Sequence, residues 1–276
     1  MCNKGCTDAI QNRKFLSCVL NAENGYEYER VITPATTKKK VVIVGGGPAG
    51  MEAARVARLK GHDVVLFEKE TTLGGQLNIA CVPPRKSEMT RGIHYLTNEM
   101  KELKVDLRLG KEACANCIME ENPDHVIIAV GAYNIVPPID GSKQTHVLDA
   151  WKVLNHEQLP SGEVVVIGGG LVGAETAELL AEMGCHVTIV EMLDEIAKEE
   201  SSTVKPTMFE TFEKHHVTLL TQTKVIQINS THIKAQKADE EITIPCDYVV
   251  LAVGAKPQTF DTTPFVEKGI DVHFIG

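Results

Sequence analysis

An internal repeat is the feature that most constrains how this chain can fold. An apolar run over residues 41–44 leads into the glycine motif of residues 45–50, and a similar run over 164–167 leads into the glycine motif of 168–173. The offset that separates Gly45 from Gly168 also separates three further pairs, namely Gly61 and Gly184, Glu68 and Glu191, and the segments 124–131 and 247–254. Because self-similarity of this kind reveals shared architecture, we predict two modules built on one plan.

Both modules have the same predicted order of elements. A buried strand runs into a Gly-x-Gly-x-x-Gly turn, and a helix follows over residues 51–60 or 174–183. Gly61 and Gly184 stand where a helix ends in the left-handed conformation, and a second strand then closes with a glutamate. These are strand–helix–strand units with parallel strands. The sequence therefore predicts an α/β protein with two Rossmann-like domains.

The glycine turns indicate that each module binds a dinucleotide. The first glycine allows a tight turn, the second lets the backbone approach a pyrophosphate, and the third lets helix and strand pack closely. The helix N-terminus adds free N–H groups and the positive end of its dipole. Glu68 and Glu191 close the second strands, where a carboxylate can accept hydrogen bonds from an adenosine ribose. The alternative is that these are only tight turns in a packed sheet.

The acid at position 191 also favours NADH over NADPH. A carboxylate at the ribose would repel a 2′-phosphate, whereas an arginine would attract it. We therefore expect the second module to bind NADH more tightly than NADPH, with Glu191 as the discriminating residue.

Composition narrows the class of protein further. The chain of 276 residues is 43% hydrophobic and 24% charged, which is typical of a soluble globular protein of about two domains. No apolar run approaches the roughly 20 residues that cross a bilayer. The formal charge of −9 argues against a nucleic-acid surface, because such surfaces use Lys and Arg to neutralise phosphates. The N-terminus has no secretory signal, so we expect a cytoplasmic protein whose eight cysteines are thiols or metal ligands before disulfides.

A resemblance to a known family rests on three features: the two glycine motifs, the segment Leu73-Gly74-Gly75-Gln76-Leu77 and the two Ala-Val-Gly segments. They are similar to the two-module flavoprotein reductases related to glutathione reductase. More closely, the chain resembles the C-terminal half of fused iron-sulfur flavoenzymes such as 2,4-dienoyl-CoA reductase, enoate reductase and trimethylamine dehydrogenase. The resemblance implies two nested domains, the second inserted in the first. An FAD-binding domain is expected over 39–145 plus 261–276, and an NAD(H)-binding domain over 146–260.

The resemblance also implies which residues contact the cofactors. The expected FAD contacts are Gly45, Gly47, Pro48, Ala49, Gly50, Glu68, Lys69, Gly75, Gln76, Ala129, Val130 and Gly131. The expected NADH contacts are Gly168, Gly170, Leu171, Val172, Gly173, Glu175, Glu191 and Gly254. Glu175 has two interpretations, since it could approach the nicotinamide or be a solvated glutamate that favours the helix dipole.

Residues 1–38 are expected to be the remnant of an iron-sulfur motif followed by a linker. Cys2, Cys6 and Cys18 match the second, third and fourth cysteines of the family's motif, and the first would lie upstream of Met1. A 4Fe-4S cluster usually requires four thiolates, so we expect it in the full-length parent and not in this chain alone. At the other end, the strand over 272–276 stops before the Gly-Asp pair of the family is complete, which weakens the expected FAD site.

The resemblance implies an electron path from NADH to FAD, then through the 4Fe-4S cluster to an N-terminal FMN barrel that reduces an unsaturated substrate. This chain would supply positioning, and the cofactors the chemistry; no catalytic side chain can be assigned from the sequence. Two alternatives stay open. Cys114 and Cys117 form the CxxC that a pyridine nucleotide-disulfide reductase would use. A module that binds ADP without catalysing a reaction would have the same glycine turns.

Overall fold

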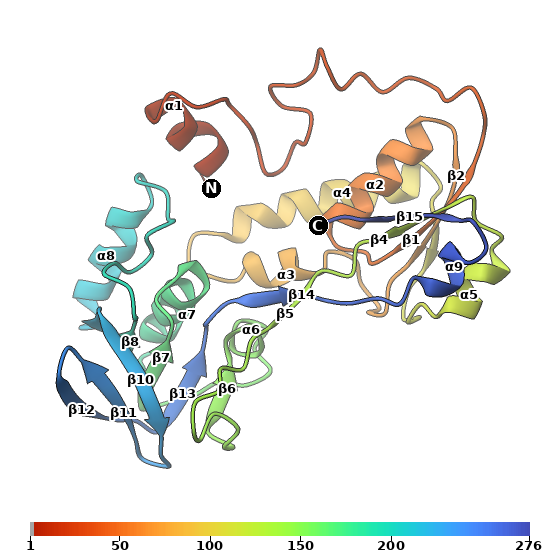
Figure 1. Ribbon diagram of the computed structural model, residues 1–276. Helices are drawn as coiled ribbons and strands as arrows, with labels where there is room; N and C mark the ends of the chain where they lie inside the picture. The colour runs from red at the N-terminus through yellow and green to blue at the C-terminus, as the bar shows by residue number, and fades with distance from the viewer. Residues whose placement is uncertain (1–2) are drawn as a thin grey trace. The chain divides into compact units, whose positions relative to one another are not determined.

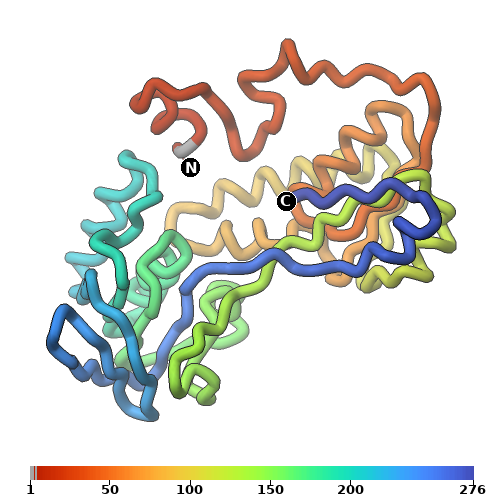
Figure 2. Tube along the Cα trace, in the orientation of Figure 1, coloured from red at the N-terminus to blue at the C-terminus, as the bar shows by residue number. Residues whose placement is uncertain are grey.

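The computed structural model describes residues 3–276, which divide into two compact units. Unit 1 comprises residues 1–22, 82–87 and 134–256, and unit 2 comprises residues 23–81, 88–133 and 257–276. Figures 1 and 2 trace the chain from its N-terminus in red to its C-terminus in blue. Each unit is built around its own five-stranded parallel sheet.

Unit 2 contains the first glycine motif. Its sheet has the order β15-β4-β1-β2-β3. The strands are β1 (Lys40–Val44), β2 (Asp63–Phe67), β3 (Asp106–Arg108), β4 (His125–Ile128) and β15 (Asp271–Phe274). The sheet strands are parallel to their neighbours, with β1 between β2 and β4. The carboxyl ends of these strands therefore lie at one edge, where parallel sheets bind ligands.

Helices cover both faces of this sheet: α2 (Pro48–Leu59) and α4 (Thr90–Glu102) pack on one face, and α5 (Ala115–Glu120) and α9 (Thr263–Val266) pack on the other. Helix α3 (Gln76–Ala80) and a 3-10 turn η2 (Ser87–Met89) lie in the connection between β2 and α4. Alternate residues of β1 point to opposite faces, as the twofold period of a strand requires. Ile43 packs in a core with Met51 of α2, and Val44 packs in a second core with Ile118 of α5.

Unit 1 repeats the plan around the second glycine motif. Its sheet has the order β6-β13-β7-β8-β9. The strands are β6 (Val147–Asp149), β7 (Glu163–Ile167), β8 (His186–Val190), β9 (Thr218–Leu220) and β13 (Tyr248–Leu251). Helices α1 (Ala9–Gln11), α6 (Ala150–Leu154), α7 (Leu171–Glu182) and α8 (Lys205–Lys214) belong to this unit, with a π-helical turn η1 over Lys4–Asp8.

The two units differ in what covers one face of the sheet. In unit 1 an antiparallel sheet of β10 (Thr223–Ile228), β11 (His232–Lys237) and β12 (Glu240–Pro245) stands between β9 and β13 in the chain. Its Ile233 and Val225 share a core with Val165 and Ile167 of β7. In unit 2 the corresponding connection, from β3 to β4, contains α5. The nested α/β architecture is as predicted, but the antiparallel sheet was not.

The chain passes between the units at residues 133–134 and 256–257, earlier than the expected boundaries at 145–146 and 260–261. The connections pair as a two-stranded sheet of β5 (Ala132–Asn134) and β14 (Ala255–Pro257). Residues 134–145 group with unit 1 because their backbone bonds to β10: the Ile228 N–H donates to the Asp140 carbonyl at 2.8 Å.

The N-terminal segment also groups with unit 1, not with a separate linker of residues 1–38. Asp8 Oδ1 accepts hydrogen bonds from the hydroxyls of Ser201 and Ser202, each at 2.9 Å, and Asn3 Nδ2 donates to Thr203 Oγ1 at 3.0 Å. Residues 23–38 fall in unit 2, where Glu23 pairs with Arg55. Within residues 3–276, no helix is both long and apolar enough to cross a membrane.

Candidate functional site

The first glycine turn joins β1 to α2 at the carboxyl edge of the unit 2 sheet. Gly45 has φ +109°, which disfavours any residue with a Cβ. A Cβ on Gly50 would lie 1.9 Å from the Gly45 carbonyl oxygen, so the third glycine lets the helix pack against the turn. Both observations agree with the roles that the sequence predicts for the first and third glycines of the motif.

The second glycine of the turn, Gly47, borders open space. A Cβ built there would come no closer than 4.0 Å to another atom, the Cα of Gly75. The loop at Gly74 and Gly75 lies against the turn, and the Gly74 N–H donates to the Gly46 carbonyl at 2.9 Å. At Gly47, therefore, no neighbouring side chain blocks the approach of a pyrophosphate to the backbone.

The buried carboxylate of Glu68 points back at the same turn. Its Oε2 accepts a hydrogen bond from the Gly46 N–H at 2.6 Å, and its Oε1 accepts one from the Glu70 N–H at 2.8 Å. The carboxylate is thus held where the second strand ends, next to the glycine turn. This is the placement that a ribose-binding acid requires.

Unit 1 repeats this geometry almost atom for atom. Gly168 has φ +102°, and a Cβ on Gly173 would lie 1.9 Å from the Gly168 carbonyl oxygen. A Cβ on Gly170 would meet nothing within 4 Å. Glu191 Oε2 accepts a hydrogen bond from the Gly169 N–H at 2.6 Å, the counterpart of the Glu68 contact.

Both corners fit the pyrophosphate of a dinucleotide. Gly47 and Gly170 are the N-cap residues of α2 and α7, and no side chain among residues 3–276 caps either helix. The first N–H groups of a helix have no partner within it, and the helix dipole makes this end favourable for phosphate. A dinucleotide cofactor such as FAD or NAD(H) would complete each site and supply the redox chemistry.

The other expected contacts vary in exposure. Ala129 is buried, and its carbonyl oxygen would be 2.2 Å from a Cβ on Gly45. Gly131 has φ +71° and faces Gln76, whose amide donates to the Ala132 carbonyl at 3.3 Å. A further group is open to solvent or partly so and has no cofactor-specific feature: Pro48, Ala49, Lys69, Leu171, Val172 and Gly254. Their roles stay predictions.

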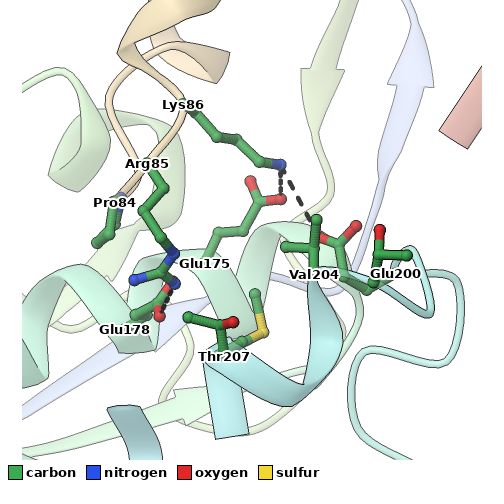
Figure 3. Close-up of a pocket in the computed structure, with 10 residues that line it drawn as sticks. Pro84, Arg85, Lys86, Glu175, Glu178, Glu200, Val204 and Thr207 are labelled. Atoms are coloured by element: carbon green, nitrogen blue, oxygen red, sulfur yellow. Dashed lines mark hydrogen bonds and ion pairs between the residues drawn. The ribbon is translucent and has the colours of Figure 1, made fainter. Parts of the chain in front are cut away.

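Glu175 is not a solvated glutamate, so that interpretation is wrong. Its side chain is 9% exposed and pairs with the ammonium of Lys86 in a small pocket of unit 1 (Figure 3). Beside this pair, Arg85 forms an ion pair with the buried carboxylate of Glu178, one helical turn along α7. The segment over residues 82–87 therefore places two cations against two acids of the helix that begins at the second glycine turn.

A third acid, Glu200, completes this cluster. Its Oε2 is buried, lacks a hydrogen-bond partner among the described residues and lies 4.0 Å from Lys86 Nζ. Its Oε1 accepts a hydrogen bond from the Ser201 N–H at 2.7 Å. Arg85, Lys86, Glu178 and Glu200 were not expected at a site. Nothing in their local spacing signals it, because three distant segments come together only in the fold.

The structure describes two of the three cysteines that were expected to bind the cluster. Cys2 lies outside the described residues. Cys6 and Cys18 are exposed, and their segments run side by side because the Ser17 N–H donates to the Gly5 carbonyl at 2.7 Å. Over residues 3–276, no three His, Cys, Asp or Glu side chains gather as a metal site. The three-cysteine ligand set stays a prediction.

The CxxC motif is oxidised, whereas the sequence analysis expected thiols. Cys114 and Cys117 form a disulfide with a Cα–Cα distance of 5.2 Å, which is within the range that a disulfide spans. The other cysteines that the structure describes are free, and three of them are buried: Cys81, Cys185 and Cys246.

Comparison with known proteins agrees with this geometry. Residues 39–272 match the family model described as pyridine nucleotide-disulphide oxidoreductase. The chain is 72% identical over its full length to a bilirubin reductase from Mediterraneibacter gnavus, and covers 43% of that protein. It is 41% identical to an NADH oxidase from Thermoanaerobacter brockii, of which it covers 44%.

A solved structure of 2-naphthoyl-CoA reductase has the same fold over the whole chain, with a TM-score of 0.90 and 30% identity, and the chain covers 42% of it. The chain thus spans less than half the length of each of these three relatives. The matches confirm the expected relation to longer, fused oxidoreductases and the α/β fold with dinucleotide-binding Rossmann-like domains. This chain belongs to the pyridine nucleotide-disulphide oxidoreductase family.

Proposed function

We propose that unit 2 binds FAD and unit 1 binds NADH, so that the chain passes electrons from NADH to a flavin. The observation that carries the proposal is the duplicated corner. In each unit an open second glycine begins an uncapped helix, and a carboxylate is hydrogen-bonded to the same turn. One such turn is a weak signal, but two with the same atomic contacts support a pair of dinucleotide sites.

The open second glycines provide a direct test. Because Cβ atoms at Gly47 and Gly170 meet no protein atom closer than 4.0 Å, Gly47→Ala and Gly170→Ala should fold normally. The added methyl would occupy the space of the pyrophosphate and weaken binding by about tenfold or more, equivalent to ~1.4 kcal/mol. We expect Gly47→Ala to weaken FAD alone and Gly170→Ala to weaken NADH alone, measured by flavin fluorescence and calorimetry.

Each variant serves as the control for the other, and circular dichroism checks that both fold. Unchanged affinity for both cofactors in both variants would contradict the assignment. Binding of ADP with no FAD by the wild type would instead support a nucleotide-binding module without a working flavin. In the same titration, NADPH binding more tightly than NADH would contradict the role of Glu191, whose carboxylate lies at the proposed ribose position.

In the whole protein, we propose that electrons continue from FAD through a 4Fe-4S cluster to an FMN barrel that reduces an unsaturated substrate. The identity to a bilirubin reductase over the full chain supports this class of reaction. Exposed Cys6 and Cys18 on adjacent segments are compatible with two cluster ligands. The test is bilirubin-dependent oxidation of NADH by the full-length protein, together with iron and sulfide analysis. NADH oxidation without any effect of bilirubin would exclude this substrate.

A further inference from the structure

The disulfide between Cys114 and Cys117 has no role in the proposed electron path. Cys114 ends the connection from β3 and is exposed, whereas Cys117 is half-buried on α5. The Cys117 N–H also donates to Cys114 Sγ at 3.2 Å, so the two residues are held together by a second contact. Cys114 is therefore the more accessible member of the pair to an external thiol.

The disulfide attaches a loop to the core of unit 2. Ile118, next to Cys117, is fully buried and packs with Phe67 and Val44. On the other side of the bond, residues 109–113 lead back to β3 without regular structure. The disulfide therefore links Cys114, the N-cap residue of α5 at which this loop ends, to Cys117 within a helix that the core holds in place.

The same loop contacts the strand end that holds Glu68. The Lys111 N–H donates to the Glu68 carbonyl at 3.0 Å, and the Gly110 N–H donates to the Glu70 carbonyl at 2.8 Å. The Lys111 ammonium lies 5.6 Å from the centre of the Phe67 ring. Glu68 in turn accepts from the Gly46 N–H of the glycine turn. A continuous series of contacts thus leads from the disulfide to the proposed ribose-binding acid.

We propose that Cys114 and Cys117 form a reversible dithiol–disulfide site that exchanges electrons with small dithiols. We also propose that its oxidised form orders the 109–113 loop and strengthens the binding of the adenosine end of FAD. The first statement is independent of the proposed function, and the second rests on the assignment of FAD to unit 2.

The exchange transfers two electrons from the external dithiol to the cysteine pair. A thiolate of the external dithiol attacks the exposed Cys114 sulfur, a mixed disulfide forms, and Cys117 leaves as a thiolate that takes up a proton. The second thiol of the same dithiol molecule then attacks the dithiol's first sulfur, which is bonded to Cys114 in the mixed disulfide, and Cys114 is released. Two electrons and two protons pass to the cysteine pair, and the dithiol becomes a cyclic disulfide. A small disulfide reverses the reaction.

The buried cysteines supply the background for a labelling experiment. Burial raises the pKa of the Cys81 and Cys185 thiols, and burial together with the nearby Asp247 carboxylate raises that of Cys246 to about 11. The thiolate is the reactive form, so these residues should not be alkylated in the native protein near neutral pH. Changes in labelling at residues 114 and 117 can therefore be read by peptide mass.

The first experiment is alkylation of the whole chain with iodoacetamide before and after treatment with dithiothreitol. We expect residues 114 and 117 to be unlabelled at first, to become labelled together after reduction, and to return to the unlabelled state after addition of oxidised lipoamide. Labelling of both residues before any reduction would overturn the site. Failure to reduce the pair in the native protein would also overturn it.

The second experiment compares FAD affinity by flavin fluorescence for the oxidised and reduced protein. Ordering even one residue costs free energy equivalent to about a fivefold change in affinity, so we expect about fivefold weaker binding after reduction. The double variant Cys114→Ser with Cys117→Ser should have the FAD affinity of the reduced wild type, and dithiothreitol should not change it. Asn116→Ser, at the exposed residue between the two cysteines, should behave as the wild type. Equal affinity in both redox forms would overturn the coupling. Absence of FAD binding in both forms would reject the flavin assignment as well, while the labelling would still decide the redox pair.

Discussion

Lys86 shows how one side chain can hold a site together. Its ammonium pairs with Glu175 and lies 4.0 Å from Glu200 Oε2, and the two acid side chains are 9% and 2% exposed. Burying a carboxylate costs free energy unless a positive charge or hydrogen-bond donors compensate for it. Glu175 and Glu200 are therefore tolerated in this pocket largely because Lys86 is present.

Lys86→Met should consequently destabilise unit 1. The change removes the ammonium and leaves both carboxylates in the pocket, which should lower the free energy of unfolding by about 3 kcal/mol. Chemical denaturation followed by circular dichroism measures the loss. Arg91→Met is the matched control, because Arg91 and its partner Glu88 are 78% and 53% exposed, and exposed pairs contribute at most ~1 kcal/mol. Equal losses in the two variants would contradict the proposed role of Lys86.

At the scale of elements, an ion pair fixes the end of α5 against β1. Lys40 Nζ donates to Glu121 Oε2 at 2.8 Å, and the hydrogen bond from Lys40 holds the pKa of this carboxyl below its usual value. Coulombic attraction from Lys40 and Arg108 acts in the same direction, against the opposing effect of burial. The pair thus joins the first strand of unit 2 to the helix that contains Cys117.

Glu121→Gln should reduce stability in a pH-dependent way. A carboxyl whose pKa is lower in the folded state stabilises the protein above its unfolded pKa, about 4.3 for Glu, and loses this effect as the pH falls through the folded pKa. We expect a loss of at most ~1 kcal/mol at pH 7 that becomes smaller as the pH falls below about 4.3. Denaturation curves recorded over this pH range measure it. Glu120→Gln, at the exposed neighbouring residue, is the control; a loss that does not become smaller on acidification would argue against the ion pair.

At the scale of the whole molecule, the proposed sites lie in separate units, each with its own sheet and cores. Ligand binding stabilises the part of a protein that forms the site. NADH should therefore slow amide exchange over residues 168–173 and near Glu191, and FAD should do so over residues 45–50 and near Glu68. Hydrogen exchange with mass spectrometry measures both. Protection of residues 45–50 by NADH alone, equal to that of 168–173, would contradict separate sites.

The repeat by itself predicted the strands, the glycine turns and the acids that face them. These features are local: the left-handed φ of Gly61 and Gly184, both +92°, follows from a helix end next to a strand. The comparison of two copies could not predict the sheet of β10–β12, because the copies differ there and only one contains it. The grouping of residues 134–145 with unit 1 also depends on the fold, because the bond between Ile228 and Asp140 joins segments far apart in the chain.

The sequence alone thus determined the two dinucleotide corners, because a glycine turn and the strand end beside it are set by a short stretch of backbone. The tertiary structure decided the surroundings of Glu175, since Lys86 and Glu200 reach it from distant segments. The disulfide of the CxxC motif, in contrast, is a local feature that the sequence analysis did not predict, since its two Cα atoms lie 5.2 Å apart across a single turn. Spacing along a chain predicts local conformation, whereas contacts between buried charges depend on how the whole unit packs.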